Sequence, residues 1–194
     1  MTQIARNSLL SLEAYAKARK DFRARVIAHK KNRTLRLGEH VTLLFEDELT
    51  IRYQVQEMLR IERIFEDAGI QQELDAYNPL IPDGSNWKAT MLIEYTDVEE
   101  RQRMLAKLKG IETAVWIQVE GCKRVPAIAD EDLERENEEK TSAVHFLRFE
   151  LSDEMRKALQ YGVGLAAGVD HPAYQARLDP VPADARAALA GDLA

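Results

Sequence analysis

Two hydrophobic periods divide this chain, and the change between them constrains the fold more than any other feature. From residue 8 to residue 31 the apolar side chains recur at helical spacing, with Leu12, Tyr15, Phe22 and Val26. Side chains three, four or seven positions apart lie on one face of an α-helix, so this stretch predicts an amphipathic helix. Between residues 33 and 47 the apolar side chains occupy alternate positions, which is typical of β-strands.

The rest of the N-terminal half predicts a hairpin, a helix and turns. Gly38-Glu39 separates two alternating runs, which predicts a β-hairpin closed by a Gly-X turn. A long helix is predicted over 48–68, with Gly69 as the residue that ends it. The segment 78–84 is rich in Asn-Pro and Pro-Asp-Gly turn sequences, so we place the end of an N-terminal lobe there.

The second half predicts a β-α-β pattern twice. Strands are predicted over 88–95, 114–119, 143–151 and 163–169, and helices over 96–108 and 152–162. Two such halves in one antiparallel sheet form the ferredoxin-like split βαβ arrangement. We therefore predict an α+β fold in which N-terminal helices with a β-hairpin are packed on a ferredoxin-like antiparallel sheet lobe.

The predicted organisation has three parts that pack as one compact unit. Residues 1–84 form the N-terminal helical and hairpin lobe, residues 85–175 the ferredoxin-like lobe, and residues 176–194 a C-terminal tail with a short helix. A chain of 194 residues with 45% hydrophobic residues is large enough to bury a sizeable core.

Composition and charge argue against several classes of protein. The net charge of −6 argues against general binding to nucleic acids or membranes by the whole surface. Cys122 is the only cysteine, so neither an intramolecular disulfide nor a Cys-x-x-Cys motif is possible. No run approaches the ~18 apolar residues of a membrane span, and no signal-peptide pattern is found near residue 1. We expect a cytoplasmic protein.

Three polar residues lie where the predicted helix 48–68 should be apolar. A helical projection gathers the apolar side chains into one wide arc, and Glu62 falls near its middle. Glu57 and Gln54 lie within or beside the same arc. Because a carboxylate without a partner in an apolar interior costs several kcal/mol, we expect these side chains to have partners on another element.

The predicted first helix offers such partners. Arg19 projects into the centre of its apolar stripe, and His29 lies at the edge of that stripe. If the two helices face each other, Arg19 can pair with Glu62, and His29 can approach Glu57. The candidate polar cluster therefore consists of Arg19, His29, Gln54, Glu57 and Glu62.

This cluster has two interpretations. An internal network of salt bridges and hydrogen bonds would fix the register of the two helices without any chemistry. Alternatively, Glu57, Glu62 and His29 would bind a divalent metal ion, since carboxylates with imidazole suit iron, manganese or zinc. Neither Glu-x-x-His nor His-x-x-x-His occurs in the chain, which weakens the metal interpretation. The sequence leaves open whether the protein is an enzyme.

A second candidate site lies in a loop near residue 170. Asp170, His171 and Tyr174 come just after a predicted strand, where loops often carry function. Asp170 and Tyr174 could orient His171 or share a proton with it. The alternative is a turn around Pro172 that Asp170 caps, and the sequence favours this second interpretation.

Two charged runs predict which partners the surface attracts. Residues 17–36 carry nine Lys or Arg residues against one Asp, and residues 130–140 carry seven acidic residues against two basic. Nucleic-acid binding is not expected, because the aromatic residues near the basic run belong to the apolar stripe. We expect the basic helix to attract an acidic protein partner or the chain's own acidic run.

Several strings in the sequence resemble a known family. They are AHKKNR at 28–33, FED at 45–47, QVQEMLR at 54–60, YNPLIPDG at 77–84 and the DHPxY pattern at 170–174. With these strings, nearly the whole chain resembles an uncharacterised proteobacterial family, domain-of-unknown-function family 3501. The resemblance implies no established activity and no catalytic residues.

The resemblance also implies a cellular context. Genes of this family neighbour rubrerythrin-like and iron–sulfur proteins, which implies a role near iron or peroxide metabolism. We therefore expect an accessory or interaction protein linked to iron and redox (oxidative stress) metabolism, whose partner is a protein of such a system or a second copy of the chain. The alternative is a small metal-binding protein or enzyme with a carboxylate and histidine site between the N-terminal helices.

Overall fold

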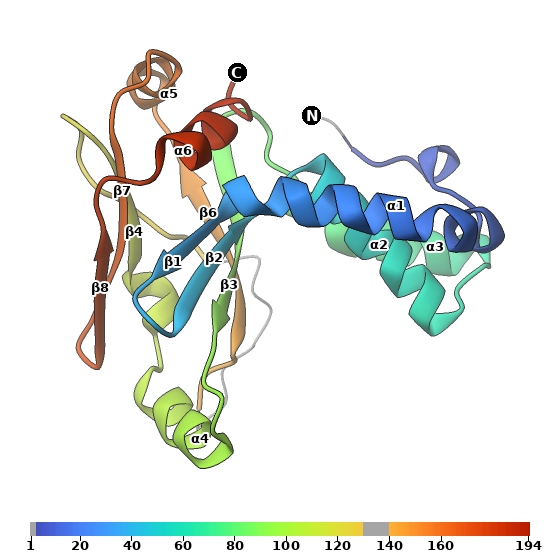
Figure 1. The fold of residues 1–194 in the computed structure, drawn as a ribbon, viewed down its shortest axis with the longest axis horizontal. Coiled ribbons are helices and arrows are strands. Elements are labelled where there is room, and N and C mark those ends of the chain that lie inside the picture. Colours follow the sequence, from blue (N-terminus) through green and yellow to red (C-terminus); the bar gives the residue numbers. More distant parts are fainter. Residues whose placement is uncertain (1–2, 130–139) are drawn as a thin grey trace.

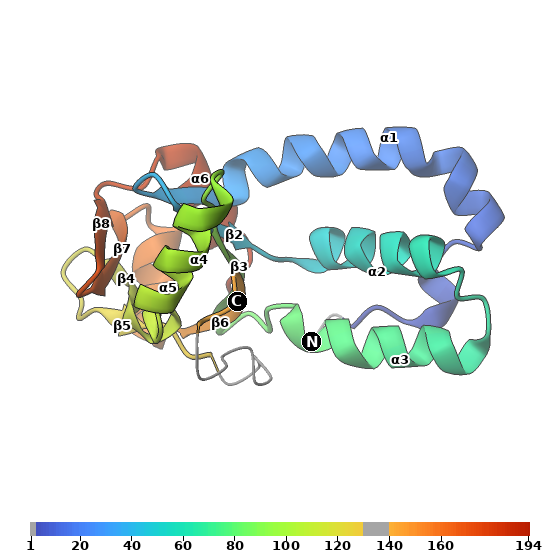
Figure 2. The same ribbon diagram turned by 90° about the horizontal axis from the view of Figure 1, so that it is seen from below.

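The computed structural model describes residues 3–129 and 140–194, and it confirms the predicted α+β class. Two four-stranded antiparallel sheets form a β body, and three helices project from this body as an arm (Figures 1 and 2). The acidic run at 130–139 lies outside the described residues, and so does its predicted contact with the basic run.

The first sheet contains the predicted hairpin. Its strand order is β1-β2-β3-β6, with β1 (Thr34–Leu37), β2 (Val41–Phe45), β3 (Asn86–Ile93) and β6 (Val144–Glu150). Gly38 has a φ of 72° in the turn between β1 and β2, a left-handed conformation that glycine adopts without steric cost. Val41, Leu43 and Phe45 are buried in the core, as the alternating pattern of this strand predicts.

The second sheet faces the first across one hydrophobic core. Its order is β5-β4-β7-β8, with β4 (Val115–Val119), β5 (Val125–Pro126), β7 (Leu165–His171) and β8 (Tyr174–Leu178). Ile128 and Arg148 exchange two backbone hydrogen bonds of 2.8 Å between the β5 and β6 edges. At the opposite edges, the Tyr174 hydroxyl donates to the Leu37 carbonyl at 2.6 Å. These contacts join the two sheets along both sides of the core.

The strands of the predicted ferredoxin-like lobe do not form one sheet, and this corrects the predicted arrangement. β3 pairs with β6 in the first sheet, whereas β4 pairs with β7 in the second. A ferredoxin-like sheet would place β7 beside β3, but β2 occupies that edge in a register running from Val41↔Ile93 to Phe45↔Ala89. The other edge of β7 is taken by β8.

The core includes residues from all three predicted parts of the chain. Leu35 of the hairpin, Ile117 of β4 and Leu189 of α6 (Ala183–Ala190) belong to the same buried cluster. The Trp87 indole N–H donates a 2.9 Å hydrogen bond to the Leu189 carbonyl, which fixes α6 against β3. Two further helices, α4 (Val98–Lys107) and α5 (Asp153–Gln160), pack on the body through Leu105 and Leu159.

The arm has a small core of its own. It consists of α1 (Leu12–Lys30), α2 (Glu48–Glu62), α3 (Asp67–Tyr77) and the segment before α1. The buried side chains of this core are Ile4, Ile51, Val55, Leu59, Leu74 and Leu80. Two amide side chains hold the N-terminal segment: Gln56 bonds the backbone N–H and C=O of Leu10, and Asn78 bonds those of Ile4.

Within the described residues, no helix combines the length and apolarity needed to cross a bilayer.

The predicted long helix 48–68 ends at Glu62, because the chain turns at Arg63, and a separate helix, α3, begins at Asp67. Arg63 has a φ of 55°, and its N–H bonds the Leu59 carbonyl. The Ile64 N–H bonds the same carbonyl at 2.9 Å, which closes the end of α2. Gly69, the predicted terminator, lies inside α3 instead. Residues beyond Glu62 therefore leave the apolar arc, and Phe65 is 70% exposed.

Candidate functional site

The Glu57 carboxylate, in the arm, accepts hydrogen bonds from side chains of both α1 and α2. Glu57 accepts a 2.6 Å hydrogen bond from the Tyr15 hydroxyl and two from Arg19, from Nε at 2.7 Å and from Nη2 at 2.9 Å. Arg60, one turn along α2, adds a fourth at 3.2 Å. The Glu57 side chain is 13% exposed. The cluster therefore crosslinks α1 to α2 inside the arm.

The electrostatics of this cluster keep Glu57 ionised. The hydrogen bonds from Arg19 lower the pKa of Glu57 to about 2, and they outweigh the opposing effect of burial. Burial, followed by the hydrogen bond to Glu57, raises the pKa of Tyr15, so its hydroxyl stays a donor. The two carboxylate oxygens of Glu57 accept four hydrogen bonds from protein groups, so their hydrogen-bonding capacity is largely used.

Two members of the predicted cluster meet, and the other three lie elsewhere. Arg19 pairs with Glu57 instead of the predicted Glu62. Glu62 is exposed at the last residue of α2, and Gln54 is also exposed. Burial, and then the nearby Glu62 charge, raises the pKa of Glu73 in α3. The turn at Arg63 takes residues 64–68 off the projected apolar face, whereas Glu62 lies in the last turn of α2 before it and is exposed.

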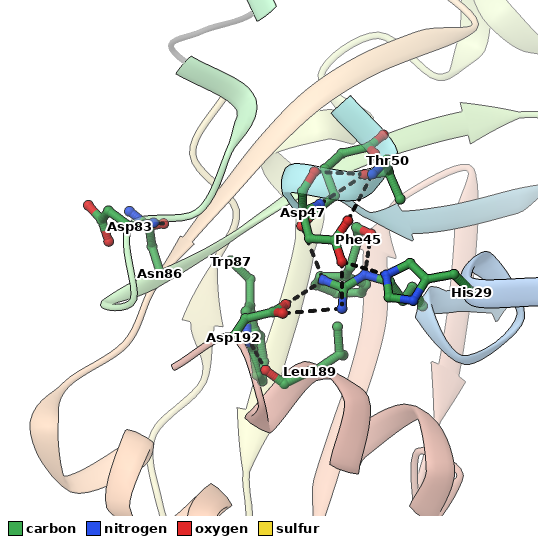
Figure 3. A network of polar contacts seen from close by, with 11 residues as sticks. His29, Phe45, Asp47, Thr50, Asp83, Asn86, Trp87, Leu189 and Asp192 are labelled. Carbon is green, nitrogen blue, oxygen red and sulfur yellow. Dashed lines mark hydrogen bonds and ion pairs between the residues drawn. The ribbon is translucent and has the colours of Figure 1, made fainter. Parts of the chain in front are cut away.

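His29 belongs to a second network, at the joint between arm and body. Its Nε2 lies 2.5 Å from Oδ2 of Asp47, not beside the predicted Glu57. Asp47 is the N-cap of α2: its Oδ1 accepts from the Thr50 N–H, and its own N–H donates to the Thr50 hydroxyl, both at 2.9 Å. Figure 3 shows His29 and Asp47 pointing toward each other, with Asp192 of the C-terminal region close by.

The buried cation of this network is Arg33, which is 2% exposed. Its guanidinium donates to the backbone carbonyls of Phe45 at 3.0 Å and Glu46 at 3.1 Å. It also forms a two-point contact with the Asp192 carboxylate, and Nη1 lies 3.5 Å from Oδ2 of Asp47. Arg33 therefore ties the end of α1, the β2–α2 junction and the C-terminus together.

The two carboxylates beside Arg33 have opposite pKa shifts. Burial raises the pKa of Asp47, but the Arg33 charge, the Thr50 N–H and His29 together lower it below its ordinary value. Burial raises the pKa of Asp192 above its ordinary value, and Arg33 offsets this only in part. Two carboxylates thus share one buried guanidinium, and His29 stands at the solvent side with its side chain 35% exposed.

Sequence reasoning did not identify Arg33, Asp47 or Asp192. The Asp47-x-x-Thr50 spacing was a readable capping signal for α2. Asp192 gave no such signal, because it lies 159 residues from Arg33 and only the folded chain joins them.

Comparison with known proteins identifies the family. The model described as "Protein of unknown function (DUF3501)" matches residues 3–193. The chain belongs to this family. A crystal structure of a novel protein of unknown function from Burkholderia pseudomallei K96243 is 57% identical to it. That similarity covers 100% of both chains, with a TM-score of 0.95. No curated protein matches the sequence.

The three residues of the predicted loop site do not converge in this DUF3501 chain. His171 is satisfied by backbone groups: Nε2 lies 3.0 Å from the Lys109 carbonyl, and Nδ1 accepts from the Ala173 N–H at 3.1 Å. Asp170 pairs with Arg124 at 2.5 Å. The Tyr174 hydroxyl bonds the hairpin backbone instead of His171. Each side chain fixes a different part of the β7–β8 corner.

The metal interpretation finds no donor set in the part of the chain that the structure describes. Glu57 is engaged with Arg19, Glu62 lies in solvent, and His29 contacts Asp47. Among residues 3–129 and 140–194, no group of three or more His, Cys, Asp and Glu side chains is arranged to hold a metal ion.

The arm also carries most of the large hydrophobic side chains that are exposed in the described residues of this DUF3501 chain. In the described residues, six large hydrophobic side chains are exposed, and four of them lie on the arm: Leu10, Ile27, Ile61 and Phe65. At the end of the arm a groove of about 330 Å³, which we call the tip groove, is lined by Leu9, Leu10, Leu59, Ile64, Phe65 and Ile70. A second groove of about 440 Å³ lies between α1 and α2, and Leu10 lines both grooves.

Proposed function

We propose that this protein is an accessory protein that binds a partner protein through its helical arm. The single observation that carries the proposal is the concentration of exposed apolar side chains on the arm. Ile61 and Phe65, at 61% and 70% exposed, lie on either side of Glu62, where α2 ends. Figure 2 shows this end of α2 pointing away from the β body. Exposed apolar side chains that gather beside a groove mark interaction sites more often than isolated ones do.

The size of the tip groove suits a protein side chain. Full burial of one Phe or Leu side chain contributes about 1.5–3 kcal/mol, so Phe65 and its neighbours could supply much of the affinity of a transient complex. The body, in contrast, buries most of its large apolar residues in one shared core, and Val98 and Tyr161 are exposed singly on different helix ends. Binding through the arm would therefore leave the β body unchanged.

We propose that the partner belongs to an iron or redox system. This part of the proposal is supported by the family resemblance and its gene context, which name rubrerythrin-like and iron–sulfur proteins as the first partners to test. Nothing in the described residues assigns a reaction to the chain itself, so the proposal is one of binding rather than catalysis.

Removing the apolar tip should abolish partner binding. In the Ile61→Ser/Phe65→Ser variant, we expect recovery of a partner from native extract to fall at least about tenfold, because the contact loses two buried apolar anchors. Quantitative pull-down with the tagged full-length chain measures this loss. Both side chains are exposed, so the fold should be retained, and circular dichroism checks it.

The matched control is Val98→Ser/Tyr161→Ser, which removes the two large hydrophobic side chains that are exposed in the described part of the body. Its recovery of the same partner should equal that of the wild type. Equal recovery by the tip variant and the wild type, or no reproducible partner in any extract, would rule out the arm as the binding element.

A further inference from the structure

The outer side of α1 presents a stripe of exposed residues, most of which are three or four positions apart. The stripe comprises Lys17, Lys20, Ala24, Ile27, Ala28 and Lys31, all exposed. Residues at this spacing share one helix face. Figure 2 shows α1 along one edge of the arm, with α2 on its inner side and no other element on its outer side.

The charge of this helix opposes that of the whole chain. α1 carries six basic residues against two acidic ones, although the net charge of the chain is −6. Arg19 is compensated by Glu57 at 2.7 Å, and Lys17 by Glu13 at 2.8 Å. Among the described residues, four other exposed cations on or just after α1 have no acidic partner: Lys20, Arg23, Arg25 and Lys31.

We propose that the outer stripe of α1 binds an acidic α-helix of the partner protein. This inference rests on the proposed function and names the chemistry of the partner. Ala24 and Ala28 are small enough for a second helix to approach closely, and Ile27, 48% exposed, supplies an apolar contact between them. Lys20 and Lys31 lie at either end of this apolar patch, where they would meet carboxylates.

The composition of the stripe favours a protein over a nucleic acid. Binding to single-stranded nucleic acid relies on aromatic side chains on which bases stack. The aromatic residues of α1 face inward: Tyr15 is buried, with its ring 6.1 Å from the ring of Phe22, and Phe22 lies 6.0 Å from Tyr53 of α2. The outer stripe contains lysine, alanine and isoleucine only.

A defined probe tests this inference. The probe is a fluorescent, synthetic helical peptide of about 20 residues, with Glu on one face and Ala and Leu on the other. Anisotropy with the full-length chain should show binding at about 50 mM salt that weakens steeply at about 300 mM, since the contact is electrostatic. Lys20→Glu/Arg23→Glu/Lys31→Glu should weaken binding at least about tenfold.

The matched control is Arg103→Glu/Lys107→Glu/Lys123→Glu, which changes the net charge equally at exposed positions outside the arm. It should bind the peptide nearly as the wild type does. An equal loss in both triple variants, no binding at low salt, or tighter binding to an RNA oligonucleotide of similar charge would overturn the inference. If the peptide fails while the tip variant still loses its partner, the docking function stands and only the acidic helix is excluded.

Discussion

Arg33→Met is expected to lower the free energy of unfolding by about 3–5 kcal/mol, the largest effect of any single substitution that we propose. The guanidinium is 2% exposed and bonds two backbone carbonyls and the Asp192 carboxylate. Methionine fills a similar volume but leaves these acceptors without a donor. Asp192 then stays buried as an uncompensated charge, or it must take up a proton. Urea unfolding followed by circular dichroism measures the loss.

Two further variants make this prediction specific. Arg36→Met removes an exposed arginine from β1 and should change stability by no more than about 0.5 kcal/mol. Adding Asp192→Asn to Arg33→Met should restore part of the lost stability. Arg33→Met leaves the Asp192 carboxylate buried without its cation, and Asp192→Asn removes that charge. If the two substitutions were additive, or if Arg33→Met cost less than about 1 kcal/mol, the buried guanidinium would not be what joins the arm to the body.

Local periodicity predicted most elements of this fold, but not β8 (Tyr174–Leu178), which lies where a loop and a C-terminal tail were expected. The stripe that includes Tyr15 and Val26 is the buried side of α1, and the alternation at Val41, Leu43 and Phe45 is the buried side of β2. Both patterns record which side of an element faces the core. They carry no information on which neighbour an element takes, so two sheets could not be distinguished from one ferredoxin-like sheet.

The wrong helix end and the wrongly predicted side-chain partners also have physical explanations. The turn at Arg63 uses a left-handed residue that is not glycine, so the usual signal for a helix end was absent. A helical projection gives the direction of a side chain but not its height along the neighbouring helix. It therefore placed Arg19 in the interface correctly and chose Glu62, which is five residues from its actual partner Glu57. Long-range partners such as Asp192 depend on tertiary packing alone.

Glu57→Ala is expected to cost about 2 kcal/mol and to loosen α1 specifically. The substitution removes the acceptor for Tyr15, Arg19 and Arg60, and leaves the Tyr15 hydroxyl inside the interface without a partner. Only Tyr15 and Val26 of α1 are buried, so this helix depends on few other contacts. Hydrogen exchange should therefore speed up most in the amides of α1, while the amides of β3 change little.

Acid provides an independent test of the same contact. The pKa of Glu57 is lowered from 4.5 to about 2 in the folded chain, so its stabilising effect is complete above the unfolded value of 4.5 and is lost as the pH falls toward 2. The stability difference between wild type and Glu57→Ala should therefore be largest near neutral pH and shrink at about pH 3. Glu62→Ala, at an exposed position of the same helix, should show no such pH-dependent difference. If the difference in the free energy of unfolding between wild type and Glu57→Ala stayed constant from neutral pH to about pH 3, the Glu57 charge would not be what holds α1 to α2.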